Sequence, residues 1–108
     1  MTGSEYQKLA MRTENPECRV LTNVGLGLSG EAGECADIIK KHIHHGHDLD
    51  KEHLKTELGD VCWYIALGCE LIGCSMDEIM RMNIEKLKAR YPDGFDCEKP
   101  IHRIAGEV

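Results

Sequence analysis

Two pairs of acidic residues interrupt stretches of apolar or small residues, Glu31 with Glu34 and Glu57 with Asp60. Because residues three apart lie on one face of an α-helix, each pair would point two carboxylates in the same direction. Two such helices packed side by side would bring four carboxylates together, and these repel one another unless a cation lies among them. Oxygen ligands suit a hard cation such as Mg²⁺. The pattern therefore indicates a candidate metal site.

Spacing alone is weak evidence for that site. Asp and Glu make up 19 of the 108 residues, so chance gives about three acidic pairs at this spacing. Other pairs, such as Glu14/Glu17 and Asp93/Glu96, occur in polar stretches with Pro or Gly, as is typical of a solvated surface. The first two pairs instead occur in segments suited to burial, where charges are rarely left unpaired. Residue chemistry leaves two readings open, a metal site and a solvated helix face.

The arrangement Glu31-x-x-Glu34, 22 intervening residues and Glu57-x-x-Asp60 resembles the ExxE…ExxD signature of the MazG-like all-α nucleotide pyrophosphohydrolases. The likeness covers residues from about 5 to 97 and is greatest to the short single-domain members found in phages and bacteria. Larger members carry a further Glu immediately before the first pair, where this chain has Gly30. Further motifs that carry the resemblance are Glu5-Tyr6-Gln7, Arg12-Thr13, Lys40-Lys41, Asn83-Ile84-Glu85-Lys86-Leu87 and Arg90-Tyr91.

This resemblance implies an enzyme that hydrolyses (deoxy)nucleoside triphosphates to the monophosphate and pyrophosphate. Mg²⁺ is the expected cofactor and Mn²⁺ a candidate substitute. Glu34 is the candidate general base, activating a water for in-line attack. The expected metal ligands are Glu31, Glu34, Glu57 and Asp60.

Basic and aromatic residues supply candidate substrate contacts. Lys86 and Arg90 lie one helical turn apart with Asn83 behind them, which is either a solvated helix edge or, beside a metal site, a phosphate clamp. Lys41 would neutralise further charge on the triphosphate. Trp63 is either a core residue or part of the nucleotide pocket or of a subunit interface.

Apolar periodicity predicts four helices and an all-α, four-helix-type bundle. The first runs from Ser4, capped by Ser4 with Gln7, to about Thr13. The second runs from Asn15-Pro16 to about His45, with Gly30 and Gly33 expected where a backbone or ligand approaches closely. The third begins near Asp48 or Asp50 and ends before Gly73, and the fourth opens with Ser75 and Glu78 and ends at Arg90 or Tyr91.

Composition limits the protein class. A chain of 108 residues forms one domain, expected over residues 4–97 with a C-terminal tail over 98–108. A net charge of −6 argues against a nucleic-acid polymer as partner, and no apolar run is long enough to span a membrane. Six cysteines without a C-x-x-C pair indicate buried thiols, with those at 35, 62 and 69 at core positions, and a reducing cytoplasm.

Gly46 is the expected helix stop after the histidines of residues 42–47, which are interpreted as a solvated helix end rather than a metal site. The family resemblance implies self-association as a dimer or tetramer. A di-iron bundle would need Glu-x-x-His motifs, which neither acidic pair provides. A non-enzymatic helical metal-binding or adaptor protein is the remaining alternative.

Overall fold

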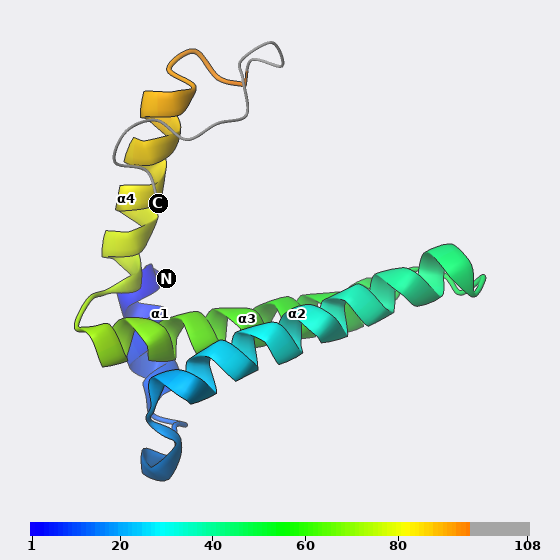
Figure 1. Cartoon of the computed structure of the whole chain (residues 1–108), viewed down its shortest axis with the longest axis horizontal. Coiled ribbons are helices and arrows are strands. Elements are labelled where there is room, and N and C mark those ends of the chain that lie inside the picture. Colours follow the sequence, from blue (N-terminus) through cyan, green and yellow to red (C-terminus); the bar gives the residue numbers. More distant parts are fainter. Residues whose placement is uncertain (96–108) are drawn as a thin grey trace. The chain divides into compact units, whose positions relative to one another are not determined.

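The structure is a computed structural model that describes residues 1–95 and is all-α, as predicted (Figure 1). No β-strand occurs among these residues, and the predicted domain end, the tail and Cys97 lie outside them. The chain divides into a first compact unit, Met1–Met76, and a second that begins at Asp77. The helices are α1 (Gly3–Met11), α2 (Leu21–His44), α3 (Lys51–Ile72) and α4 (Met76–Arg90), with a 3₁₀ turn at Pro16–Cys18.

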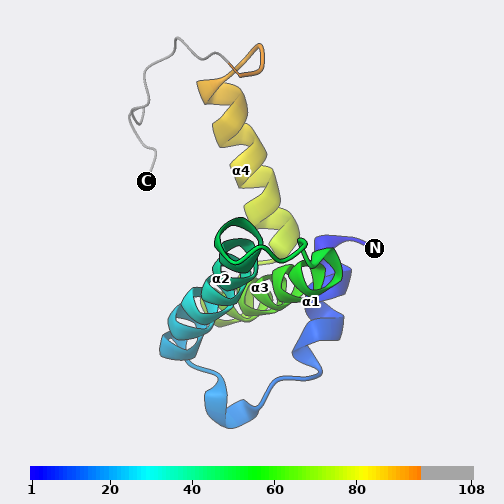
Figure 2. The same ribbon diagram turned by 90° about the vertical axis from the view of Figure 1, so that its right-hand side faces the viewer.

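In the first unit, α2 and α3 form an antiparallel hairpin and lie side by side along their length (Figures 1 and 2). Gly46, with φ of 70°, lies just beyond the end of α2, which confirms the predicted helix stop. Asp50 caps α3 by accepting a hydrogen bond from the His53 backbone N–H at 3.0 Å. Gly73, with φ of 78°, ends α3 in the left-handed conformation. Local signals therefore predicted both ends of α3 correctly.

Helix α1 packs on α3 and is tied to its C-terminal end by one buried amide. Gln7, only 6% exposed, donates from Nε2 to Glu70 Oε1 at 2.8 Å and to the Cys74 carbonyl at 3.0 Å. Its Oε1 accepts the Met76 backbone N–H at 2.7 Å. One side chain thereby forms hydrogen bonds with α3, with the loop that follows it and with the first residue of α4. Separation of α1 from α3 would break all three hydrogen bonds.

Two predicted helix starts are wrong. The capping box that begins α1 is formed by Thr2 and Glu5, not by Ser4 and Gln7, because the Gln7 amide is used in the buried contact with α3. Asn15 does cap a turn, but that turn is a 3₁₀ turn, and α2 begins only at Leu21. Arg19 follows this turn with a non-helical backbone, φ of −84° and ψ of 63°, and forms ion pairs with Glu14 and Glu70.

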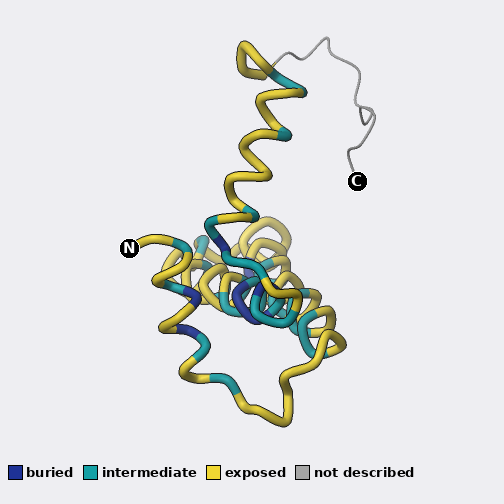
Figure 3. The backbone as a smooth tube through the Cα atoms, turned by 90° about the vertical axis from the view of Figure 1, so that its left-hand side faces the viewer, coloured by how far each residue is buried: buried dark blue, intermediate teal, exposed yellow. Residues whose placement is uncertain are grey.

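Few residues of the first unit are buried, and most of its backbone is exposed or intermediate (Figure 3). Leu67 is its one large, fully buried side chain among the described residues, and the other buried apolar residues are Ala10, Ile38, Ala66, Cys69 and Met76. Of the three cysteines predicted in the core, only Cys69 is buried; Cys35 is half-buried and Cys62 is exposed. Among residues 1–95 no single helix is long and apolar enough to cross a membrane, and α3 and α4 meet that condition only when counted together.

Candidate metal centre

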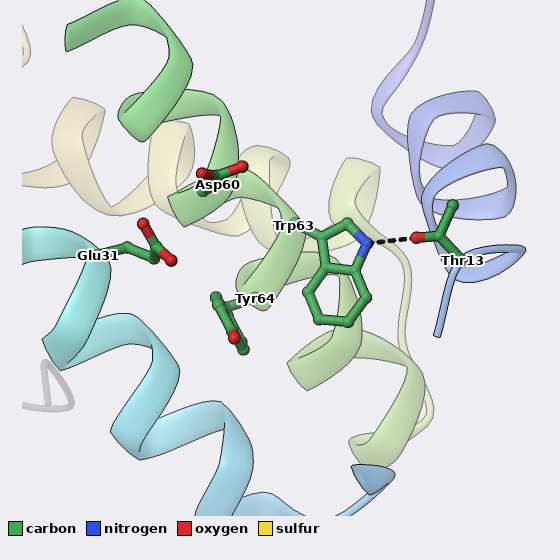
Figure 4. Close-up of a pocket in the computed structure, with 5 residues that line it drawn as sticks. All are labelled: Thr13, Glu31, Asp60, Trp63 and Tyr64. Carbon is green, nitrogen blue, oxygen red and sulfur yellow. Dashed lines mark hydrogen bonds between the residues drawn. The ribbon is translucent and has the colours of Figure 1, made fainter. Parts of the chain in front are cut away.

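Three carboxylates converge between α2 and α3: those of Glu31, Glu57 and Asp60. One oxygen of each lies within 4.8 Å of the other two. Glu31 comes from α2 and Asp60 from the facing side of α3, as Figure 4 shows. Packing of the hairpin thus joins one member of the first acidic pair to both members of the second, whereas helical spacing predicted that all four carboxylates would come together.

Glu34, the fourth predicted ligand, does not belong to this group. It is exposed, one turn along α2 from Glu31, yet near enough that its charge raises the pKa of the Glu31 carboxyl. Its roles as metal ligand and as general base stay predictions.

The electrostatics of the group fit a cation. A hydrogen bond with Glu57, then desolvation, and then the charges of Glu57, Asp60 and Glu34 raise the pKa of Glu31 to about 7. Near neutral pH the Glu31 carboxyl therefore keeps a proton part of the time, because its ionisation beside the other carboxylates is unfavourable. A divalent cation can take the place of that proton, and an all-carboxylate donor set suits Mg²⁺ or Mn²⁺.

His53 contacts the group from one turn earlier on α3, and the sequence analysis did not identify it. Its Nε2 lies 3.2 Å from Glu57 Oε1, close enough for the imidazole N–H to donate to the carboxylate. This hydrogen bond holds the Glu57 side chain in place, as such contacts do for metal ligands generally. The four-residue spacing on one helix face was the signal that could have revealed it.

The histidines of residues 42–47 do not form a comparable centre. Residues 42, 44, 45 and 47 are exposed, and within residues 1–95 no histidine belongs to a group with metal-ligating geometry. The solvated interpretation of this stretch is consistent with the exposure.

A cavity of about 250 Å³, which we name the second cavity, opens near the turn of the hairpin. It is lined by Ile38, Lys41, His47, Asp48, Asp50 and His53.

A cavity of about 390 Å³ adjoins the carboxylates. Its lining combines Glu31 and Asp60 with a threonine and two aromatic side chains, Thr13, Trp63 and Tyr64 (Figure 4). Trp63 therefore lines a cavity beside the carboxylates instead of belonging to the buried core, although its contact with substrate stays a prediction. Both rings come from the turn of α3 that follows Asp60, so one helix supplies carboxylate and aromatic surface together.

Contacts from outside the cavity hold the two rings in place. The Trp63 indole N–H donates to Thr13 Oγ1 at 2.8 Å and, more weakly, to the Ala10 carbonyl at 3.3 Å. The Trp63 and Tyr64 rings meet edge to face, with centroids 5.1 Å apart. A Cβ at Gly27 would lie 2.1 Å from the Tyr64 ring, so the ring occupies the space that a side chain on α2 would take. A close approach thus occurs at Gly27, whereas a Cβ at Gly30 or Gly33 would meet no described atom within 4 Å beyond its own helix backbone and chain neighbours. The approach of a ligand to Gly30 and Gly33 stays a prediction.

The predicted cationic and amide contacts are divided between the two units, with Lys41 in the first. Lys41 lines the second cavity and forms an ion pair with Asp37 at 3.0 Å, a contact that lowers the pKa of Asp37. Asn83, Lys86 and Arg90 follow one another along α4, in the second unit. Their role as a phosphate clamp stays a prediction.

Comparison with known proteins places these residues in a sequence family. The family model described as the MazG nucleotide pyrophosphohydrolase domain matches residues 21–95. The Gene 37 protein of Mycobacterium phage L5 is 33% identical over 78 residues, which cover 68% of this chain and 68% of that protein. No solved structure matches the chain. The family match includes all three converging carboxylates and both aromatic residues, but α1 and Thr13 lie before it.

Proposed function

Because this chain belongs to the MazG nucleotide pyrophosphohydrolase family, we propose that it hydrolyses (deoxy)nucleoside triphosphates to the monophosphate and pyrophosphate with the help of Mg²⁺. Membership implies nucleotide pyrophosphohydrolase activity, whereas the metal and the triphosphate substrate are our proposal. The observation that carries it is the group of three carboxylates at the edge of an aromatic cavity. That pairing offers a place for the metal-bound phosphates beside a place for the nucleoside.

Glu31, Glu57 and Asp60 would hold the metal, and bound Mg²⁺ would supply positive charge to the phosphate oxygens. For the metal to enter, the proton held by the Glu31 carboxyl must leave. His53 keeps Glu57 oriented during that exchange through its 3.2 Å contact. Mn²⁺, which takes the same oxygen ligands, is the expected substitute.

The remaining residues act on substrate and water. Glu34, exposed next to Glu31, is the proposed general base, since a solvated carboxylate can accept a proton from an attacking water. Trp63 and Tyr64 would contact the nucleoside. The proposed triphosphate contacts are Lys41, Asn83, Lys86 and Arg90.

We also propose that the chain self-associates as a dimer or tetramer. Large apolar side chains are exposed along α2, with Leu26 at 76% and Ile43 at 63% exposure, while the buried core holds few large residues. Burying such side chains against another copy would add core that a chain of this size lacks. Light scattering after size-exclusion chromatography tests this proposal, and a monomer at micromolar concentration contradicts it.

The reaction is tested by measuring pyrophosphate and monophosphate release from a panel of nucleoside triphosphates with Mg²⁺, Mn²⁺ or EDTA. We expect metal-dependent release by the wild type. The rate of release should fall about 100-fold or more in Glu57→Gln and Asp60→Asn, because each variant replaces a charged carboxylate ligand with a neutral amide. Glu52→Gln, an exposed acidic position on the same helix paired with Lys55, is the matched control and should retain activity.

Normal activity in either ligand variant would contradict the assignment of the carboxylates. Release of inorganic phosphate instead of pyrophosphate would contradict the reaction. Absence of release from every nucleotide, with or without metal, would favour the non-enzymatic alternative.

A further inference from the structure

The segment that precedes the family match contributes one wall of the cavity, through Thr13. We infer that Thr13 is a positioning residue: its hydroxyl holds the Trp63 indole at the angle at which the ring stacks on the base of the substrate. This inference rests on the proposed function, because it takes the cavity to be the place where the nucleoside binds.

The hydrogen bonds around Thr13 have a defined direction. The Thr13 hydroxyl donates to the Ala10 carbonyl at 2.7 Å, so its oxygen lone pairs are left to accept the Trp63 N–H at 2.8 Å. An indole N–H can only donate, and a hydroxyl can donate and accept at once. Thr13 therefore links the last turn of α1 to the indole, donating to the first and accepting from the second.

The opposite side of the aromatic pair is equally constrained. Tyr64 meets Trp63 edge to face, and its ring lies against α2 at the space left by Gly27. Trp63 is thus held from α1 and Tyr64 from α2, while the space between them and the carboxylates of Glu31 and Asp60 stays open. Rings fixed before a ligand arrives lose little freedom on binding, which favours affinity.

Engagement of the indole N–H also determines what Trp63 can recognise. With its single donor directed to Thr13 and Ala10, the ring offers a ligand only its face and edge. Stacking on a ring face accepts any base, because every base has a π face. Trp63 therefore contributes binding that depends on ring size and overlap and not on the exocyclic groups of the base. Substitution of Thr13 should then weaken the binding of nucleotides whose bases have the same ring size by similar factors.

The test compares Thr13→Val, which loses the hydroxyl at nearly constant shape, with Thr13→Ser, which keeps it. Thr22→Val, an exposed position in the first turn of α2, is the control. Trp63 is the only tryptophan of the chain, so its fluorescence reports binding of an α,β-imido nucleoside triphosphate directly. Steady-state kinetics with dATP and dGTP in Mg²⁺ give KM and kcat, and circular dichroism with thermal melting verifies the fold of each variant.

For Thr13→Val we expect KM and the fluorescence Kd to rise about 3- to 10-fold, with kcat changed less than about twofold. The factors for dATP and dGTP should agree, and Thr13→Ser and Thr22→Val should behave as the wild type. Unchanged KM and Kd in a folded Thr13→Val would overturn the inference. Equal impairment in Thr13→Ser would also overturn it, because the hydroxyl would then not be what matters.

The same measurements separate this inference from the proposed reaction. Pyrophosphate release without any change in Trp63 emission on nucleotide binding would overturn the stacking role and leave the reaction intact. Nucleotide-dependent emission without pyrophosphate release would overturn the reaction, and the Kd values of the Thr13 variants would still decide the positioning role. Neither release nor an emission change would overturn both.

Discussion

The two halves of α3 are built differently. Near its C-terminal end, Ala66, Leu67 and Cys69 are buried and α1 packs on the helix. In its first ten residues, Lys51–Asp60, no residue is buried, and the carboxylates of Glu57 and Asp60 face Glu31 of α2. The buried residues of α3 are therefore at one end of the helix, and the carboxylates that face Glu31 are nearer the other.

The half of α3 without buried residues is where the unit tolerates an unfavourable arrangement of charges. Three carboxylates within 4.8 Å repel one another, and this repulsion contributes to the raised pKa of Glu31. Such an arrangement lowers the stability of the fold around it, as functional sites commonly do. Here the buried half of α3, with Gln7 attached to its end, holds the helix in place. Trp63 lies between the two halves and contacts α1 through the Ala10 carbonyl.

The largest expected effect comes from a matched pair of leucines, one in each half. Leu67→Ala should lower the free energy of unfolding by about 2–5 kcal/mol, because Leu67 is 1% exposed and its removal leaves a cavity. Leu58→Ala should lower it by less than about 1 kcal/mol, because Leu58 is 52% exposed. Urea unfolding followed by Trp63 fluorescence measures both.

Equal losses of unfolding free energy in the two variants would contradict the division of α3 into a buried and an exposed half within a single chain. If the loss in Leu58→Ala grew with protein concentration, Leu58 would be buried by another copy, and the proposed self-association would account for the result.

Features set by neighbouring residues could be predicted from the sequence. The cap at Asp50 and the stops at Gly46 and Gly73 follow from rules that involve a single turn of chain. The convergence of Glu31 with Glu57 and Asp60 followed from helical spacing together with the packing of two helices. These predictions needed only the local geometry of a helix and one tertiary contact.

Features that join distant residues could not be predicted in this way. Gln7 matches a capping residue by spacing, yet its amide binds groups 63 and more positions away. Thr13 contacts Trp63 across 50 positions. Nothing in a run of glycines distinguishes Gly27, which contacts Tyr64, from Gly30, because the distinction depends on which face of α2 meets α3. Such contacts exist only after the helices have packed.

A smaller effect is expected at His53, which belongs to the exposed half of α3. His53→Ala should weaken binding of Mn²⁺ about 10-fold, because Glu57 loses the group that orients it. His53→Gln, which keeps a donor, should lose less. Electron paramagnetic resonance of bound Mn²⁺ measures the affinity without requiring turnover. His44→Ala, an exposed histidine at the end of α2, is the control; an equal loss there would show a general charge effect and not orientation of Glu57.

The smallest expected effect is the pH dependence of stability in EDTA, because the half-exposed Glu31 is partly screened by solvent. With its pKa raised from 4.5 to about 7 in the folded protein, Glu31 keeps a proton that the unfolded chain releases above pH 4.5. Unfolding then releases a proton between pH 4.5 and 7, so the contribution of Glu31 is present at low pH and is lost as the pH rises through this window. The Tm of the wild type should therefore fall relative to that of Glu31→Gln over this range, since glutamine cannot titrate and the remaining groups are shared. Mg²⁺ should reverse the fall in the wild type, because the cation replaces the proton among the carboxylates. Parallel Tm curves for the two proteins in EDTA would contradict the raised pKa of Glu31. They would also contradict the claim that the carboxylates in the exposed half of α3 repel Glu31 in the folded protein.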